Sequence, residues 1–273
     1  MNKGSPIGFF DSGYGGLTVL KEVQKVLPQS DYLYLGDNQR APYGTQSSET
    51  VYKYTWEGVQ MLFSKGCDLV VLACNTASAK ALRRIQKNDL ITYPGKRVLG
   101  VIRPSAEIVG DFSKTNQIIV LGTEGTIAAN TYVDEFAFFS PQIKVHQYAC
   151  PTWVPLIESR QHNSAAGKKQ IQKDVETFTK AFKDADIILL GCTHYPILQQ
   201  IIEENVSDEI QVISQGEIVA LSLKLYLERH MWMQEKLAQN GTSLYLTTGN
   251  PKEFEGFAST ILGIDVDVKR IRL

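Results

Sequence analysis

Two cysteines occupy matching positions in two similar segments of the chain. Cys74 ends the run Asp68-Leu-Val-Val-Leu-Ala-Cys74, and Cys192 ends the run Asp186-Ile-Ile-Leu-Leu-Gly-Cys192. A thiol can take up or release a proton near neutral pH. The pattern therefore predicts one active site, built from two related halves, in which two thiols act as acid/base groups on opposite faces of one carbon atom.

The predicted surroundings of Cys74 favour a reactive thiol. A helix is expected directly after it, and the positive end of a helix dipole stabilises a thiolate. We expect the same setting for Cys192. A free cysteine is more commonly a small buried hydrophobe, and we assign that role to Cys67 and Cys150.

Two polar side chains could assist these thiols. His194 lies two residues after Cys192, where it could act as a general base or hold a proton. Asp11 ends a predicted strand in Phe-Asp-Ser-Gly. It could cap the following helix, or its carboxylate could orient or deprotonate the Cys74 thiol. Small hydrogen-bonding residues at other strand ends suit a small polar ligand, namely Asn75, Thr76, Thr123 and Thr126.

Composition excludes several other classes of protein. The 273 residues are 43% hydrophobic and 21% charged, with a net charge of -1, which is ordinary for a globular chain of one or two domains. The chain has no long run of basic residues, so the sequence gives no sign of nucleic-acid binding. No apolar run approaches the roughly 18 residues of a membrane span, and no signal peptide is recognisable, so we expect a cytoplasmic protein without membrane contact. The four cysteines match neither a disulfide framework nor a zinc site, so we expect free thiols and no metal.

Apolar runs alternate with amphipathic stretches along the chain, as in parallel α/β proteins. The expected strands are Ile7–Phe10, Tyr32–Leu35, Leu69–Ala73, Val98–Ile102, Ile118–Leu121, Ile143–Tyr148, Ile187–Leu190, Gln211–Ile213 and Ser243–Thr247. The expected helices are Gly16–Val26, Ser48–Lys65, Ala77–Asn88, Ala128–Phe138, Ala165–Phe182, Pro196–Val206 and Glu217–Gln239.

The repeat extends beyond the cysteines. The segments Ile7–Gly16 and Ile118–Thr126 both read as a strand, a small-residue turn and a helix. We therefore predict two similar α/β domains with mainly parallel sheets, one formed by residues 1–97 plus 214–273 and the other by residues 98–213. Ligands of parallel sheets bind beyond the carboxyl ends of the strands, so the active site is expected in the cleft between the domains.

Several longer motifs carry a family resemblance. They cover nearly the whole chain and read Phe10-Asp-Ser-Gly-Tyr-Gly-Gly-Leu-Thr-Val19, Arg40-Ala-Pro-Tyr-Gly44, Ala73-Cys-Asn-Thr-Ala77, Gly100-Val-Ile102, Gly122-Thr-Glu-Gly-Thr126, Cys150-Pro-Thr-Trp-Val-Pro-Leu-Ile-Glu158 and Gly191-Cys-Thr-His-Tyr-Pro196. With them the chain closely resembles the bacterial glutamate racemases of the cofactor-independent aspartate/glutamate racemase superfamily.

The resemblance implies the interconversion of L- and D-glutamate without cofactor or metal, in a cytoplasmic homodimer that supplies D-glutamate for peptidoglycan. It implies that Cys74 and Cys192 are the two acid/base residues. Asp11 would assist Cys74, and His194 and Glu158 would assist Cys192. The residues that match the family's substrate contacts are Asp11, Ser12, Tyr43, Gly44, Asn75, Thr76, Thr123, Thr193 and His194.

The chain departs from the family pattern at two places. Ser105 stands where the common form has Gly, and Ser214-Gln215-Gly216 stands where Asp-Ser-Gly is usual. Both affect the expected loop conformation rather than the catalytic pairs. Three other functions remain open on the residues alone: an aspartate racemase, a hydrolase or decarboxylase that uses one thiol, and a non-catalytic two-lobed binding protein.

Overall fold

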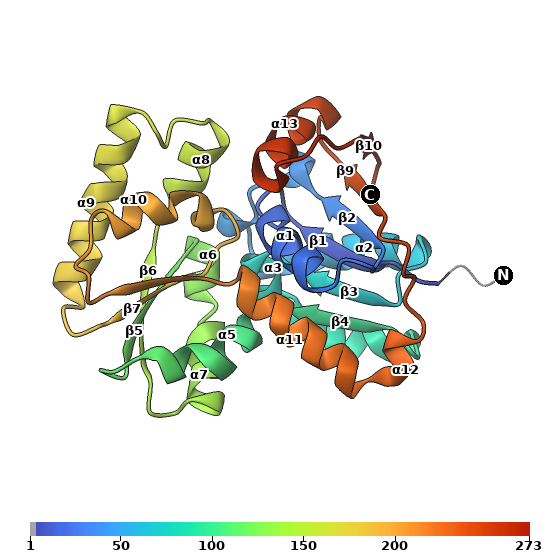
Figure 1. Cartoon of the computed structure of the whole chain (residues 1–273), viewed down its shortest axis with the longest axis horizontal. Coiled ribbons are helices and arrows are strands. Elements are labelled where there is room, and N and C mark those ends of the chain that lie inside the picture. Colours follow the sequence, from blue (N-terminus) through green and yellow to red (C-terminus); the bar gives the residue numbers. More distant parts are fainter. Residues whose placement is uncertain (1–3) are drawn as a thin grey trace.

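Two parallel sheets organise the protein, whose computed structural model describes residues 4–273 (Figure 1). The six-stranded sheet has the order β10-β9-β2-β1-β3-β4 and the four-stranded sheet the order β6-β5-β7-β8. The strands of the first sheet are β1 (Ile7–Asp11), β2 (Tyr32–Gly36), β3 (Leu69–Leu72), β4 (Arg97–Gly100), β9 (Ser243–Thr247) and β10 (Val268–Arg270). Those of the second are β5 (Gln117–Gly122), β6 (Lys144–Ala149), β7 (Ile187–Leu190) and β8 (Gln211–Ser214).

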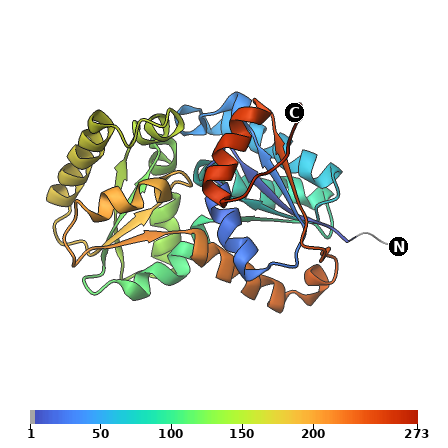
Figure 2. The ribbon, with the colours of Figure 1, turned by 45° about the horizontal axis from the view of Figure 1, so that its top comes forward.

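Helices cover the sheets and seal their apolar faces (Figure 2). In α9, for example, Gly167, Ile171, Val175 and Phe178 are buried, which is the spacing of one helix face. The helices are α1 (Leu17–Val26), α2 (Ser48–Ser64), α3 (Asn75–Lys80), α4 (Leu82–Arg84), α5 (Ile102–Ile108), α6 (Glu124–Ala128), α7 (Thr131–Phe139), α8 (Trp153–Glu158), α9 (Ala165–Ala181), α10 (Gln199–Glu203), α11 (Gly216–Arg229), α12 (Met231–Gln234) and α13 (Pro251–Leu262).

The predicted α/β class, parallel sheets and internal repeat are confirmed. The strands β1, β2, β3 and β7 are buried at every position, as their unbroken apolar sequences predict. The order β2-β1-β3-β4 of the first half recurs as β6-β5-β7-β8 in the second. Cys74 and Cys192 follow the equivalent strands β3 and β7, so their similar sequences reflect equivalent places in the fold.

Two helices are exchanged between the halves. The helix α5 follows β4 of the first sheet, yet its Ile102 and Ala106 pack with Ile118 of β5 in the second half. The helix α11 follows β8 of the second sheet, yet its Val219 and Leu223 pack in the core beneath α1. Each half therefore completes its core with a helix that follows a strand of the other.

The pairing of β4 moves the predicted boundary between residues 97 and 98 by a few residues, whereas the ranges predicted for the two domains already place α5 in the second half and α11 in the first. The strand β4 pairs with β3, so Val98–Gly100 belong to the first sheet, and Ile102 already lies in α5. The sequence reads as a strand because its apolar run continues through residue 102, but the last of these side chains lie on the exchanged helix. Beyond β8 the chain returns to the first sheet through β9 and β10.

Other differences concern element ends. The predicted helix Glu217–Gln239 divides at His230, whose backbone leaves the helical conformation. The predicted helix Ala77–Asn88 is divided into α3, α4 and a π-helical turn at Ile85–Asp89. The predicted helix Pro196–Val206 begins as a 3₁₀ turn. The helices α5, α8 and α13 and the strand β10 were not predicted.

Candidate active site

A cavity of about 100 Å³ lies between the two halves, at the carboxyl ends of their strands. Both candidate thiols, Cys74 and Cys192, line it. The other predicted site residues on its wall are Ser12, Tyr43, Gly44, Asn75, Thr76, Thr123, Glu158, Thr193 and His194. Its size suits a small metabolite. Two predicted residues, Asp11 and Thr126, lie behind this wall, with no exposed surface.

A larger groove of about 560 Å³ lies on the other side of the loop that follows Cys192. Thr18, Ile197 and Phe257 help to line it, but neither Cys74 nor Cys192 does. We therefore place the candidate active site in the smaller cavity.

Cys74 is a buried thiol at the start of α3. The Ala77 N–H donates to its Sγ at 3.4 Å, and the Ser12 hydroxyl lies 3.5 Å from the same atom. Burial, and after it the negative charge of nearby Asp11, raise the pKa of Cys74 to about 12, although the Ser12 and Ala77 contacts oppose this rise. The helix start therefore does not make Cys74 a thiolate, contrary to the sequence-based expectation, because desolvation outweighs the helix contact.

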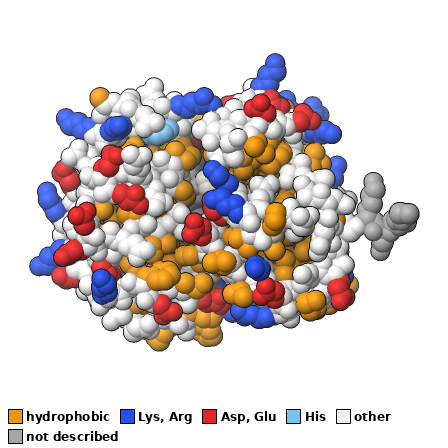
Figure 3. Space-filling view, in the orientation of Figure 1, with side chains coloured by type: hydrophobic (Ala, Val, Ile, Leu, Met, Phe, Trp, Pro, Cys, Tyr) orange, Lys and Arg blue, Asp and Glu red, His pale blue; other side chains and the backbone are white. Residues whose placement is uncertain are grey.

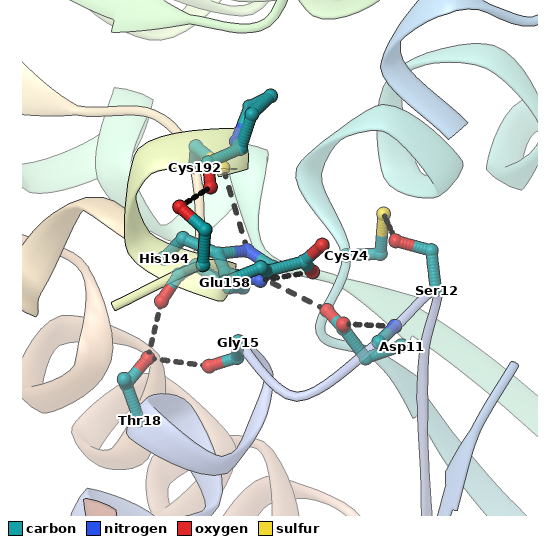
Figure 4. A network of polar contacts seen from close by, with 12 residues as sticks. Asp11, Ser12, Gly15, Thr18, Cys74, Glu158, Cys192 and His194 are labelled. Carbon is teal, nitrogen blue, oxygen red and sulfur yellow. Dashed lines mark hydrogen bonds and ion pairs between the residues drawn. The ribbon is translucent and has the colours of Figure 1, made fainter. Parts of the chain in front are cut away.

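Cys192 has a different environment, because a histidine accompanies it. His194 Nδ1 lies 4.0 Å from Cys192 Sγ, and His194 Nε2 lies 3.0 Å from Glu158 Oε1 at the end of α8 (Figure 4). Burial alone lowers the pKa of His194, but the contacts with Cys192 and Glu158 outweigh it and raise that pKa to about 10. With an acceptor at each ring nitrogen, His194 is an imidazolium beside the Cys192 side chain.

Asp11 connects the two halves beneath the thiols. Its Oδ1 accepts from Gly13 N at 2.7 Å, and its Oδ2 accepts from Thr193 Oγ1 of the second half at 3.2 Å. Burial raises the pKa of Asp11, opposed by the positive charge of His194 and by the Gly13 N–H. Asp11 therefore influences Cys74 through its charge, while its hydrogen bonds hold the Thr193 loop.

The cavity wall offers hydrogen-bond donors. Asn75 Oδ1 accepts from Tyr132 OH at 2.6 Å, which orients the amide, and its buried Nδ2 has no partner within residues 4–273. A buried donor without a partner is costly and suits a ligand with acceptor atoms. The hydroxyls of Thr76 and Thr123 lie 3.0 Å apart on the same wall. With the imidazolium of His194, these groups suit an anion.

A buried carboxylate holds the loop that carries Tyr43 and Gly44. Asp37 accepts from Tyr43 OH at 2.5 Å, from Thr248 Oγ1 at 2.8 Å and from Arg40 Nε at 2.7 Å. The loop then packs on the second half so closely that a Cβ on Gly44 would meet Thr123 at 2.7 Å. Asp37 thus fixes one wall of the cavity.

Sequence reasoning missed Asp37, Tyr132 and Thr18, which all act behind the cavity. Asp37 directly follows β2 and Asp11 is the last residue of β1, so the same strand-end argument could have identified Asp37. Tyr132 lies in α7 and has no local signal that links it to Asn75. Thr18 Oγ1 contacts the Gly15 and Thr193 carbonyl oxygens at 2.8 and 3.0 Å (Figure 4), a contact between segments 175 residues apart that no sequence pattern reveals.

The structure also bears on metal binding and on membrane insertion. Within residues 4–273, no cluster of three or more His, Cys, Asp or Glu side chains is arranged to hold a metal ion. Among the helices of the same residues, none has the length and apolar character needed to cross a membrane.

Residues 17–223 match the Asp/Glu/Hydantoin racemase family. The chain belongs to this family. It is 35% identical over 268 residues to the glutamate racemase of Streptococcus suis (strain 05ZYH33), with 98% of each chain covered. The crystal structure of glutamate racemase isoform RacE1 from Bacillus anthracis has a TM-score of 0.90 and 36% identity, over 99% of this chain and 98% of that one.

A second solved structure is similar over the whole fold. The glutamate racemase of Francisella tularensis, solved in complex with D-glutamate, has a TM-score of 0.85 and 26% identity, over 99% of this chain and 98% of that one. The protein is therefore an isomerase of the amino-acid racemase type, with the two-domain fold of this racemase family.

Proposed function

We propose that this racemase interconverts L- and D-glutamate by proton transfer between its two cysteines, without a cofactor. The observation that carries the proposal is the small, donor-lined cavity with one thiol from each half of the internal repeat. A racemase must remove a proton from one face of a carbon and return one to the other face. The names of the relatives support glutamate as the substrate.

The surroundings of the two thiols indicate how the cycle starts. Cys192 lies beside the His194 imidazolium, so we assign it the first proton abstraction, and Cys74, with its raised pKa, is the resting thiol. For one enantiomer, Cys192 removes the α-proton while Cys74 donates its own proton to the opposite face. The product leaves with the opposite configuration, and Cys192 is then the thiol and Cys74 the thiolate. The second enantiomer uses this form and runs the cycle in reverse.

The wall of the cavity stabilises charge in the transition state. Negative charge that leaves the α-carbon spreads into the adjacent carboxylate. Asn75 Nδ2 and the hydroxyls of Thr76 and Thr123 are fixed donors on that wall. Such preorganised donors lower a barrier most where water is excluded. Asp11 and Glu158 act behind the thiols, by orienting Thr193 and His194.

The direct test is turnover in D2O. Purified protein is incubated with L-glutamate and no added cofactor, while circular dichroism and deuterium at Cα are followed. Loss of optical activity with deuterium uptake supports the proposal. Turnover of aspartate instead would identify an aspartate racemase. No change with either acid would favour single-thiol chemistry or ligand binding alone.

Substitution of either thiol tests the two-base mechanism. We expect Cys74→Ser and Cys192→Ser each to lower racemisation in both directions by about a thousandfold or more, because each turnover uses both groups and acid/base catalysis contributes about this much. Cys67→Ser is a matched control, because Cys67 is buried away from the cavity. A single variant with full activity in either direction would contradict the mechanism.

We also propose that the protein supplies D-glutamate for peptidoglycan in the cytoplasm, as a homodimer. Growth of a D-glutamate auxotroph that carries the gene tests the first point. The homodimer is supported by exposed apolar side chains. Leu221 and Leu225 are exposed on one face of α11, and apolar side chains gather over α5 and α11 in Figure 3. Exposed apolar surface of this kind favours association. Sedimentation equilibrium that gives only monomer at micromolar concentration would contradict the dimer.

A further inference from the structure

Three threonine hydroxyls meet at the wall of the cavity. Thr76 Oγ1 lies 3.0 Å from Thr123 Oγ1 and 3.0 Å from Thr126 Oγ1, and the Thr123 and Thr126 hydroxyls are also 3.0 Å apart. Thr76 lies in the first turn of α3 in the first half, and Thr123 and Thr126 lie at the start of α6 in the second. The three hydroxyls, which we refer to as the threonine triangle, therefore join the two halves.

Thr126 differs from the other two members. Thr76 and Thr123 line the cavity, whereas Thr126 does not and has no exposed surface. In the part of the chain that the structure describes, the Thr126 hydroxyl has only the other two hydroxyls as hydrogen-bond partners. Its function must therefore act through Thr76 and Thr123.

The protons of the threonine triangle can be counted. The three hydroxyls have one proton each, and they make three oxygen–oxygen contacts with one another. In the empty site, each hydroxyl can therefore donate its proton to one neighbour and accept from the other. A bound carboxylate only accepts, so it draws the protons of Thr76 and Thr123 out of the triangle. The proton of Thr126 is then the one that remains, and it can donate to either of these oxygens.

A hydroxyl that accepts a hydrogen bond is a stronger donor, because the bonds polarise one another. Thr126 thus serves both states of the site. In the empty state it holds Thr76 and Thr123 in position, and in the bound state it supports the hydroxyl that donates to the ligand.

We propose that Thr126 is a positioning residue that directs the Thr76 and Thr123 hydroxyls toward a carboxylate of the substrate. The inference rests on the proposed function, since glutamate supplies that carboxylate. Because the two ligand-facing hydroxyls come from different halves, carboxylate binding also depends on the contact between α3 and α6.

The test removes the Thr126 hydroxyl while its shape is kept. We expect Thr126→Val to raise KM for both glutamate enantiomers about tenfold, which is the effect of one lost hydrogen bond in a site that binds a charged group. We expect a smaller fall in kcat, because the same two hydroxyls also stabilise the developing charge in the transition state. Thr126→Ser keeps the hydroxyl, and we expect its KM to lie within twofold of the wild-type value.

Thr55→Val is the matched control. Thr55 is also fully buried, but its hydroxyl has no partner within residues 4–273 and lies away from the cavity. We expect it to leave KM unchanged. Calorimetric titration of D-glutamate into a Cys74→Ser, Cys192→Ser background, below the unfolding temperature of each variant, measures binding without turnover and should show the same tenfold loss for Thr126→Val.

The outcomes separate the two proposals. If wild-type protein racemises or binds glutamate but Thr126→Val has unchanged KM and affinity, the positioning role is wrong and the proposed function stands. If Thr126→Ser is as impaired as Thr126→Val, the hydroxyl is not the operative group. If the wild-type protein neither binds nor racemises glutamate, the proposed function fails, and the role of Thr126 fails with it.

Discussion

At the scale of single residues, the two thiols are equivalent in the sequence repeat but not in their surroundings. Cys192 has an imidazolium partner, whereas Cys74 has the negative charge of Asp11 nearby and a raised pKa. L- and D-glutamate have equal free energy in water, so kcat/KM must be the same in both directions at every pH. The asymmetry between the thiols can therefore appear only in the separate values of kcat and KM, or in the chemistry of the free enzyme.

Alkylation of the free enzyme measures this asymmetry. We expect iodoacetamide at neutral pH to modify Cys192 at least about tenfold faster than Cys74, because the thiolate is the nucleophile. The preference should fall as the pH rises, since His194 loses its proton near its pKa of about 10 and Cys74 ionises near about 12. Mass spectrometry of the modified peptides gives both rates. His194→Asn should remove the preference, and faster modification of Cys74 would contradict the assignment.

At the scale of elements, the loop before α1 packs directly against His194 and Thr193 of the other half. A Cβ on Gly15 would meet Thr193 Oγ1 at 2.4 Å and His194 Nδ1 at 2.6 Å, so this glycine allows the two halves to approach. Gly13 in the same loop has room, because its Cβ would meet no atom closer than 3.6 Å. The two glycines therefore form a matched pair for substitution.

We expect Gly15→Ala to lower kcat/KM by about a hundredfold, because a displacement of His194 by about 1 Å separates it from Cys192. Gly13→Ala should stay within about fivefold of wild type. Steady-state rates in both directions, with circular dichroism to verify folding, provide the measurement. Equal activity of the two alanine variants would show that the close contact at Gly15 does not control the site.

A second contact between elements lies where the exchanged helices begin. Gln215 Nε2 donates to Ser105 Oγ at 2.8 Å and to the Val101 carbonyl oxygen at 3.1 Å, and all three residues are buried. The two departures from the common family pattern that the sequence shows, at residue 105 and at residues 214–215, are thus in direct contact. One buried amide joins the start of α5 to the start of α11.

We expect Gln215→Met to lower the free energy of unfolding by about 1–3 kcal/mol, because it leaves the buried Ser105 hydroxyl oxygen without a donor and the Val101 carbonyl oxygen with only the Ser105 hydroxyl at 3.4 Å. Ser105→Ala alone should have a smaller effect, since the amide keeps the Val101 carbonyl. Urea denaturation of the single and double variants gives both values and their coupling. Additive losses would show that the two side chains do not act together.

At the scale of the whole molecule, neither half has a complete core of its own. The helix α5 packs in the second half and α11 in the first, although each follows a strand of the other. Proteins with two domains commonly unfold in more than one step. Here the exchange of helices couples the halves, so loss of one half removes a helix from the core of the other.

We therefore expect one cooperative unfolding transition. Trp56 packs in the first half and Trp153 is buried in the second, so variants that keep only one of them report on each half. In these variants, with the remaining tryptophans changed to Phe, the fluorescence midpoints in urea should coincide within error. Two separated midpoints would show that the halves unfold independently.

Much of the site could be predicted from the sequence, because parallel strands bring their carboxyl ends to one edge. Matched apolar runs identified β3 and β7, and the residues after these strands had to lie at the same edge of their sheets. The thiols, Ser12, Asn75, Thr76, Thr123 and His194 were found in this way or through family motifs. The α/β class and the parallel sheets followed from the alternation of apolar runs with amphipathic stretches.

Tertiary structure alone decided the remaining features, because they depend on contacts between residues far apart in the chain. The apolar run at Val98–Gly100 does not show which sheet receives it, so these residues were assigned to the second domain although β4 pairs with β3. The sequence presents Cys74 and Cys192 as equivalents, but desolvation and the neighbouring charges make one a thiol and the other the partner of an imidazolium. The sequence by itself determined the strands and the residues that end them, whereas packing decided which sheet receives β4 and how the two thiols differ.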